Sequence, residues 1–156
     1  MTTSPRAVLV RLAVAAAILS SLPAVAHADP RFGVRFGYYT EAEDPFLGAE
    51  MLFRVIPDIY FNPNVEAVLV DDGHYFTINA DFHYDLLSGR RTFVWLGAGL
   101  AVLNTDPGGS ADSNTDFGFN LLAGVGSRRG RVIPYAQAKV ILKSDTEFAI
   151  GVGLRF

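Results

Sequence analysis

Residues 147–156 read EFAIGVGLRF, and this stretch decides how the rest of the chain is interpreted. Apolar residues occupy every second position from Phe148 to Phe156, and small or charged residues lie between them. Alternation with a period of two predicts a β-strand that has one apolar face. Such a strand hides that face in a protein core or turns it toward lipid, so the remaining sequence must distinguish between two environments.

Residues 1–28 are typical of a secretory signal peptide. Two arginines give the segment a positive start, residues 12–19 are apolar, and Ala26-His27-Ala28 fits the small residues that precede a cleavage site. We therefore expect cleavage after residue 28 and a single domain at residues 29–156, outside the cytoplasm. The apolar run is too short for a membrane-spanning helix.

The charge balance and the lack of cysteine exclude several classes of protein. The chain has 13 basic and 16 acidic residues, and removal of Arg6 and Arg11 with the signal leaves 11 basic residues and a net charge of −5. An acidic domain is disfavoured as a nucleic-acid-binding protein, so no nucleic-acid partner is expected. Because the chain has no cysteine, a disulfide framework and a cysteine-based metal site are excluded.

Eight segments of the expected domain show the alternation, each bounded by turn or loop residues. Two of them flank the turn signal Asp72-Gly73, and the others lie near residues 31–39, 46–56, 92–103, 115–126, 132–142 and 147–156. No apolar run after residue 28 is long enough for a membrane-spanning helix. Eight antiparallel strands can close on themselves and leave no unpaired edge. The predicted fold is therefore all-β, an eight-stranded antiparallel up-and-down barrel.

The register of one hairpin can be predicted from its turn. Asp72-Gly73 favours a two-residue turn, because both central positions must accept a positive φ. Folding the chain there pairs Glu66 with Asn79. It also pairs Ala67 with Ile78, so polar residues face polar residues and apolar residues face apolar ones.

Two prolines lie inside predicted strands, where each removes a backbone donor from the ladder. Pro63 and Pro134 are both near the start of their strands. We therefore expect a bulge at these positions or a strand that begins later.

The connections differ at the two ends of the predicted barrel. Those after the second, fourth and sixth strands are short and mostly basic, as in Ser127-Arg128-Arg129-Gly130. Those after the odd-numbered strands are acidic, and the longest runs from Asn104 to Asn114. Short turns at one end and longer loops at the other match a transmembrane β-barrel with both termini in the periplasm. Aromatic residues of the apolar face gather near both ends, as expected at two membrane interfaces: Tyr38, Phe76, Phe117, Phe148, Phe32 and Phe156.

A soluble carrier of the lipocalin type would use the same strands with the apolar face turned inward. The glycines favour the membrane barrel, because the other face of the last, fifth and sixth strands is mostly glycine and alanine, which a water-facing strand does not need. A narrow interior does need them, since long charged side chains require space opposite. The membrane barrel places a polar network in its interior: Arg35, Glu50, Arg54, Glu66, Asp81, His83, Asp85, Lys139 and Arg155.

With these features placed, residues 29–156 resemble the small OmpA/OmpX-type outer-membrane β-barrel family. The likeness rests on Gly151-Val152-Gly153-Leu154-Arg155-Phe156, on residues 94–100 around Gly97-Ala98-Gly99, and on the alternation elsewhere. It implies a location in the bacterial outer membrane and contact with periplasmic chaperones during biogenesis. It also implies that the outer-membrane barrel assembly machinery reads the apolar face of the last strand: Phe148, Ile150, Val152, Leu154 and Phe156.

Asp81, His83 and Asp85 share one face of a predicted strand, a pattern that suits a divalent metal or a proton site. The alternative is that they belong to the interior network of hydrogen bonds and ion pairs, since buried charges need partners. The network is the favoured interpretation, so neither a metal nor a cofactor is expected.

The predicted function is that of a non-enzymatic, monomeric outer-membrane barrel with a structural or surface-interaction role and no catalytic residues. Its expected partners are outer-membrane lipid and lipopolysaccharide. The alternative is an outer-leaflet enzyme that acylates or deacylates lipid A, with His74 beside Asp71 and Asp72 as its candidate residues, although no serine lies near them in the sequence. A narrow pore is opposed by the number of long side chains that share the interior.

Overall fold

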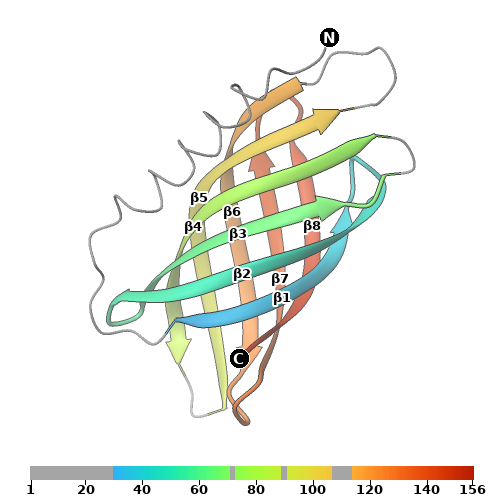
Figure 1. Cartoon of the computed structure of the whole chain (residues 1–156). Helices are drawn as coiled ribbons and strands as arrows, with labels where there is room; N and C mark the ends of the chain where they lie inside the picture. The colour runs from blue at the N-terminus through green and yellow to red at the C-terminus, as the bar shows by residue number, and fades with distance from the viewer. Residues whose placement is uncertain (1–29, 71–72, 89–90, 107–113) are drawn as a thin grey trace, which may run out of the picture.

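Eight strands form most of the chain that the structure, a computed structural model, describes: residues 30–70, 73–88, 91–106 and 114–156. In chain order they are β1 (Arg31–Tyr39), β2 (Asp44–Ile56), β3 (Ile59–Val68), β4 (His74–Ser88), β5 (Thr92–Asp106), β6 (Asn114–Ser127), β7 (Ile133–Leu142) and β8 (Glu147–Arg155) (Figure 1). Each strand pairs antiparallel with the next, and β8 pairs with β1, so the sheet closes into a barrel. The predicted all-β up-and-down barrel is confirmed. The predicted signal peptide at residues 1–28 lies outside the described residues.

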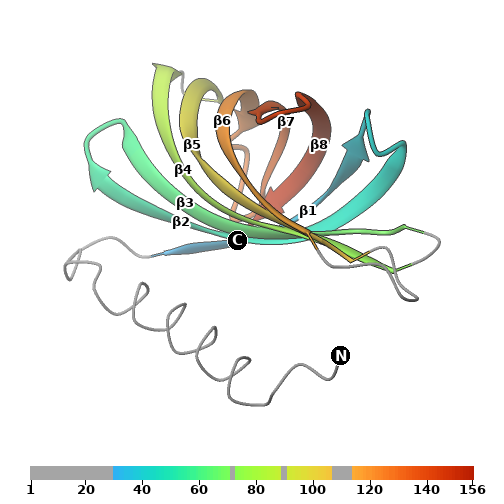
Figure 2. The same ribbon diagram turned by 90° about the horizontal axis from the view of Figure 1, so that it is seen from above.

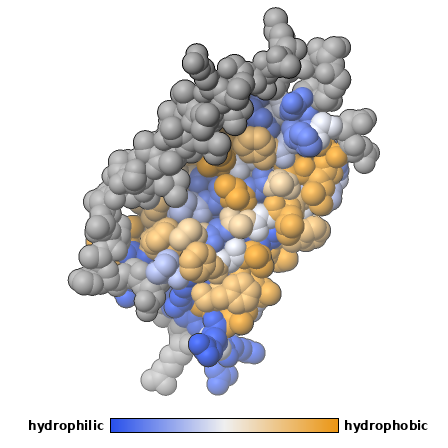
Figure 3. Space-filling model, viewed as in Figure 1, coloured by the Kyte–Doolittle hydropathy of each residue, from blue (hydrophilic) through white to orange (hydrophobic). Residues whose placement is uncertain are grey.

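The strands curve around a shared interior (Figure 2) and place their side chains alternately outside and inside it, with the apolar face outside. Phe36, Leu100 and Ile150 are 53, 64 and 60 % exposed. On the side that Figure 3 shows, hydrophobic residues cover much of the strands and hydrophilic residues gather toward the ends. This arrangement is the one predicted for a membrane barrel, and it is opposite to that of a soluble carrier. Within the described residues, no helix is both long and apolar enough to cross a membrane.

The β3–β4 hairpin differs from its predicted register by two residues. Glu66 pairs with Thr77, not with Asn79. The predicted two-residue turn is wrong, because five residues separate the end of β3 from the start of β4. Leu69 does not pair with β4, since its N–H donates to the carbonyl of Pro45 on β2 at 2.8 Å. A shift of two residues keeps every side chain on its predicted face, so the two faces are unaffected.

Both prolines interrupt a ladder, but the expected bulge or later strand start is not found at Pro63, since β3 begins at Ile59 and the β2–β3 register shifts between Arg54 and Ile56. The β2–β3 ladder has no pair at Pro63, and the side-chain amide of Asn62 donates to the carbonyl of Met51 on β2 at 2.8 Å. A side chain thereby supplies a donor next to the residue that has no N–H. Pro134 is the second residue of β7, and the β6–β7 ladder begins only at Tyr135.

The two rims of the barrel carry opposite charge. At the loop end, where the odd-numbered strands finish, the described carboxylates outside the interior are Glu41, Glu43, Asp44, Asp106, Asp116 and Asp145. At the turn end, the described arginines outside the interior are Arg31, Arg54, Arg91, Arg128, Arg129 and Arg131. The rims are therefore acidic and basic respectively, as the sequence predicted.

Candidate functional site

The interior of the barrel holds many buried polar side chains. Eight of the nine residues predicted for the polar network are buried: Arg35, Glu50, Glu66, Asp81, His83, Asp85, Lys139 and Arg155. Other buried polar residues accompany them: Asn62, Asn64, Thr77, Asn79, Asn120, Gln137 and Glu147. Six of the eight, namely Arg35, Glu50, Glu66, Asp81, Lys139 and Arg155, are called the central network below.

One ion-pair cluster is formed around Glu50 of β2. Arg155 of β8 donates from Nε to Oε1 of Glu50 at 2.7 Å, and its Nη2 lies 3.4 Å from Oε2. Asn62 donates to Oε2 at 3.1 Å, and Nη1 of Arg35 is 3.9 Å from the same oxygen. Gly33 of β1 pairs with both Glu50 and Arg155, and a Cβ added there would lie 2.7 Å from Oε1. The glycine therefore leaves the space through which this ion pair crosses β1.

A second cluster is formed around Glu66 of β3. Nζ of Lys139 on β7 is 2.5 Å from Oε2 of Glu66, and the Tyr39 hydroxyl donates to the same oxygen. Thr77 donates to it as well, at 3.1 Å. Nη1 of Arg35 is 3.4 Å from Oε1. Arg35 consequently lies between the two carboxylates and connects the two clusters.

Asp81 of β4 is held by side-chain amides. Asn64 donates to Oδ2 at 2.9 Å, and Asn120 donates to Oδ1 at 2.7 Å. Asn79 links these two amides, because it donates to Asn64 at 3.0 Å and accepts from Asn120 at 2.9 Å. The buried carboxylate thus has hydrogen-bond partners on both oxygens.

The charges of the central network are equal in number and separated by strand. Its three cations lie on β7, β8 and β1, and its three carboxylates lie on β2, β3 and β4. The formal charges of these six residues therefore sum to zero. Because a buried charge is destabilising without a partner, the network stabilises the closed barrel only as a whole.

Three predicted members lie outside the central network: Arg54, Asp85 and His83. Arg54 is exposed, and it lies where the β2–β3 register shifts near the turn-end rim. It forms no ion pair with any residue that the structure describes, so its assignment to the interior network is wrong. Arg54 lies farther along β2 than Glu50, toward the turn end, and is therefore outside the interior. Asp85 is buried but lies at the turn-end mouth, where Arg128 donates to its Oδ2 at 2.8 Å.

His83 is 2 % exposed and stacks on Trp95, with ring centroids 5.7 Å apart. Its Nε2 has no hydrogen-bond partner among the described residues. Asp81 and Asp85, which share its face of β4, are bonded to the asparagines and to Arg128 respectively. In the part of the chain that the structure describes, no three His, Asp or Glu side chains are placed to hold a metal ion.

Apolar and aromatic side chains fill the interior on both sides of the central network, a feature that the sequence analysis missed. The loop-end cluster consists of Tyr39, Phe46, Val68, Tyr75, Ala101, Leu103, Ile141 and Ala149. The turn-end cluster consists of Phe93, Trp95, Leu122, Ile133 and Tyr135. The interior is thus filled by its own side chains at three levels.

The glycines facing the turn-end cluster make room for its rings. Gly124 pairs with Trp95, and Gly153 pairs with Tyr135. A Cβ at either glycine would overlap the opposite ring. Arg155 covers the same rings from the network side, with its guanidinium carbon 4.2 Å from the centroid of Tyr135 and 5.2 Å from that of Trp95. The sequence feature that could have indicated this cluster is an aromatic residue on the inward face of a strand, opposite a glycine.

The residues of the alternative enzyme hypothesis are only partly described. His74 is exposed at the start of β4, at the loop end. Asp71 and Asp72 lie outside the described residues. Ser144 is the serine that the structure describes at the loop end, and it lies in the β7–β8 connection.

The predicted assembly signal lies on the outer face at β8. Its residues are all exposed: Phe148, Ile150, Val152, Leu154 and Phe156. The N–H of Phe156 donates to the carbonyl of Phe32 at 2.8 Å, which extends the pairing of β8 with β1 by one residue. The exposed aromatic residues of both barrel ends include Phe117, which is 77 % exposed.

Solved structures with a similar fold are outer-membrane or transmembrane barrels. The N-terminal β-barrel domain of Pseudomonas aeruginosa OprF matches with a TM-score of 0.69 and 16 % identity over 81 % of this chain and 96 % of that chain. Neisserial surface protein A matches with a TM-score of 0.63 and 18 % identity over 81 % of this chain and 94 % of that chain. A de novo designed transmembrane β-barrel matches with a TM-score of 0.58 and 13 % identity over 81 % of this chain and 94 % of that chain. No protein-family model and no curated protein matches the sequence.

A likeness at these identities concerns the fold. In this chain the eight strands close into a barrel with the apolar face outside and a filled, charged interior. The chain therefore has the fold of the small eight-stranded outer-membrane β-barrels, as its resemblance to the OmpA/OmpX-type family implied.

Proposed function

We propose that this protein is a non-enzymatic, monomeric integral outer-membrane β-barrel with a structural or surface-interaction role. The observation that carries the proposal is the distribution of polarity: an exposed apolar surface surrounds an interior of paired charges. In water, such a surface would drive aggregation, whereas a bilayer covers it with acyl chains. The protein is thus built to be solvated by lipid.

A structural role is favoured over conduction because the interior is occupied along its length. The central network lies between the loop-end and turn-end clusters, whose aromatic and aliphatic side chains fill the interior on either side of it. Eight-stranded barrels have room for little more than their own side chains. We expect no steady conductance.

The lengths of the connections support an orientation with both termini in the periplasm. Short turns are periplasmic and longer loops are extracellular in barrels of this kind, so the basic rim would lie in the periplasm and the acidic rim at the cell surface. At the surface, the carboxylates of the acidic rim would bind divalent cations that also bind lipopolysaccharide phosphates. The proposed partners are therefore outer-membrane lipid and lipopolysaccharide.

The outer face of β8 supports a role in biogenesis. Its exposed apolar row is accessible before the barrel closes, and the family resemblance implies recognition by periplasmic chaperones and the barrel assembly machinery. Phe156→Ala should reduce the amount of folded barrel in cells and leave refolding of the purified protein into vesicles unchanged. Equal loss in both settings would show that Phe156 acts only in the folded barrel.

Four measurements test the proposal as a whole. The barrel should migrate differently in detergent gels before and after heating, and it should require detergent or lipid to remain in solution. Planar bilayers containing it should show no steady conductance. A water-soluble monomer would refute membrane insertion, and activity on purified lipid A that disappears in His74→Ala would refute the non-enzymatic role.

The orientation can be tested with single cysteines, because the chain has none of its own. Ser144→Cys places a thiol at the loop end and Gly130→Cys places one at the turn end, where no atom lies within 4 Å of an added Cβ. A membrane-impermeant maleimide added to intact cells should label the first variant and not the second. The reverse pattern would place the termini at the cell surface.

A further inference from the structure

An apolar groove crosses the outer face of the barrel over β6, β7 and β8, with residues of β5, β1 and β2 at its sides. The short side chains of Ala123, Ala136 and Ala138 line it, and the larger side chains of Phe36 and Val152 border it. It consists of two adjoining hollows of about 630 and 730 Å³ that share lining residues. Both hollows are open to the surroundings, so they suit a chain that lies along the surface and not an enclosed ligand. The lining is almost entirely apolar, so the groove suits hydrocarbon.

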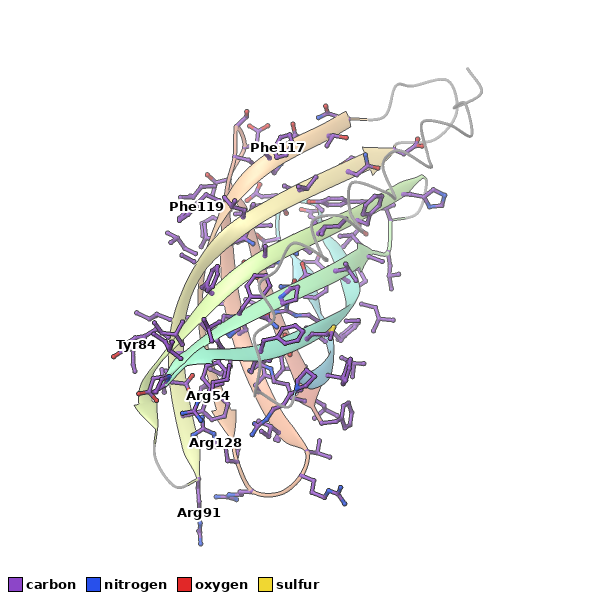
Figure 4. The ribbon with its side chains drawn as sticks, turned by 60° about the vertical axis from the view of Figure 1, so that its left-hand side comes forward. Arg54, Tyr84, Arg91, Phe117, Phe119 and Arg128 are labelled. Carbon is purple, nitrogen blue, oxygen red and sulfur yellow. The ribbon has the colours of Figure 1, made fainter. Side chains whose placement is uncertain are left out.

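The groove reaches the turn-end rim of the barrel. Thr92, Ser127 and Pro134 line its end there. Arg91 directly precedes Thr92, is exposed, and projects away from the barrel at the turn end (Figure 4). One cation therefore lies beside the opening of the groove.

The β6–β7 connection adds two further exposed arginines, Arg129 and Arg131, between the residues of β6 and β7 that line the same end. The two connections are bonded together, because the N–H of Arg128 donates to the carbonyl of Arg91 at 2.8 Å. Arg91, Arg129 and Arg131 form no ion pair with any residue that the structure describes. Three guanidinium groups are thus available at one end of an apolar groove.

We infer that this groove binds one anionic phospholipid, with an acyl chain against the alanines and the headgroup phosphate at the three arginines. Guanidinium groups bind phosphate through paired N–H donors. A phosphatidylglycerol headgroup keeps its negative charge, whereas the choline of phosphatidylcholine adds a cation that the arginines repel. The inference rests on the proposed membrane insertion but not on the orientation, since the turn end meets headgroups in either leaflet.

A second copy of the barrel is a less suitable occupant. In a twofold dimer about the membrane normal, the two turn ends would lie at the same membrane surface. The arginines beside the two grooves would then face each other, and like charges at an interface are repulsive. A lipid with a negative headgroup neutralises these charges, which a second copy cannot do.

The headgroup half of the site is tested by titrating phosphatidylglycerol or phosphatidylcholine into the detergent-solubilised barrel and counting bound lipids by native mass spectrometry. The triple variant Arg91→Gln, Arg129→Gln, Arg131→Gln should lose the preference for phosphatidylglycerol. Each arginine should contribute about fivefold to the ratio of the affinities for the two lipids at low ionic strength. Arg54→Gln is the matched control, because Arg54 is an exposed arginine of the same rim on β2, outside the groove. It should keep the preference.

The groove half is tested with Ala136→Phe, which fills the groove with an apolar side chain that the lipid-facing surface tolerates. This variant should lose the first bound lipid of either kind. Ala80→Phe is its control, because Ala80 is an exposed alanine on the outer face of β4. It should bind lipid as the unmodified barrel does.

Each variant is first checked for heat-dependent gel migration and insertion into vesicles. If the unmodified barrel does not insert, the proposed function fails; if it inserts but binds both lipids equally, only the lipid site is refuted. Equal effects of the triple variant and Arg54→Gln would indicate a general charge effect and would also refute the site. Dimers that Ala136→Phe abolishes would assign the groove to a second copy and overturn the inference.

Discussion

Replacing Glu66 with glutamine tests whether the central network stabilises the closed barrel. The carboxylate is bonded to Lys139, Tyr39 and Thr77 and lies 3.4 Å from Arg35. Glutamine keeps the size of the side chain and removes its charge. Among the described residues, Lys139 then has no carboxylate within ion-pair distance, because Glu66 is its ion-pair partner.

The magnitude follows from the contacts that remain. Removing one partner of a buried ion pair destabilises a protein by about 3–5 kcal/mol. Lys139 keeps a contact with the Tyr39 hydroxyl at 3.2 Å, and Arg35 keeps Glu50 at 3.9 Å. We therefore expect Glu66→Gln to lower the free energy of unfolding by about 3 kcal/mol, at the lower end of that range. The double variant Glu66→Gln with Lys139→Met removes both charges and should recover to within about 1.5 kcal/mol of the original.

Urea titration of the barrel in lipid vesicles measures these differences. Trp95 is the single tryptophan and is fully buried inside the barrel, so its fluorescence reports directly on the loss of the closed interior. Arg54→Gln is the control for loss of one charge at an exposed position. It should change the free energy of unfolding by less than about 0.5 kcal/mol.

Two results would refute the reasoning. One is a Glu66→Gln variant as stable as Arg54→Gln, which would mean that the buried carboxylate is not needed for stability. The other is a double variant whose loss equals the sum of the losses of Glu66→Gln and Lys139→Met. Simple additivity is the behaviour of side chains that do not interact.

Three further predictions use the same titration. Gly124→Ala places a Cβ against a buried ring and should lower the free energy of unfolding by about 1–3 kcal/mol, whereas Gly130→Ala, with no atom within 4 Å, should have no effect; equal effects would contradict the packing argument. Asn62→Ala removes the donor beside Pro63 and should lower the free energy of unfolding by about 1–3 kcal/mol. Adding Pro63→Ala should restore part of the loss, because alanine returns a backbone N–H. No recovery would contradict the role of Asn62 as a substitute donor. Leu100 is 64 % exposed on β5, and Leu100→Arg should lower the free energy of unfolding by about 2–4 kcal/mol in vesicles. An unchanged stability would contradict the lipid-facing assignment.

The two faces of each strand could be predicted from the sequence because alternation is local. Glu50, Glu66 and Lys139 are buried and Phe148 is exposed because successive side chains of a strand point to opposite faces. Barrel closure followed from the number of such strands. Neither inference required knowledge of which residues meet across the interior.

The partners within the network could not be predicted, because they depend on how the strands are staggered around the barrel. Arg155 and Glu50 are 105 residues apart in the chain. The hairpin register was wrong for a related reason: the bond from Leu69 to Pro45 involves β2, which lies outside the hairpin. The position of Arg54 likewise depends on where β2 leaves the barrel interior, which alternation does not encode.

The aromatic interior was missed because the interior was predicted from its polar side chains, and the aromatic residues considered were those of the apolar face. Trp95 and Tyr135 have the parity of the charged face, and each pairs with a glycine. If every aromatic residue had been assigned to a strand face by its position in the alternation, as the charged residues were, both would have been placed inside. Their identity as a cluster still required the fold, since they belong to β5 and β7.

Gly33 makes the last step of barrel closure sensitive to register. The ion pair between Arg155 and Glu50 spans three strands and passes over this residue of β1. If β8 slipped by two residues so that Gly153 lay opposite Gly33, every side chain would still face the correct side, but Glu50 would lose its guanidinium. The pair therefore favours the correct register over a shift by two residues, which the alternation of polar and apolar residues cannot distinguish.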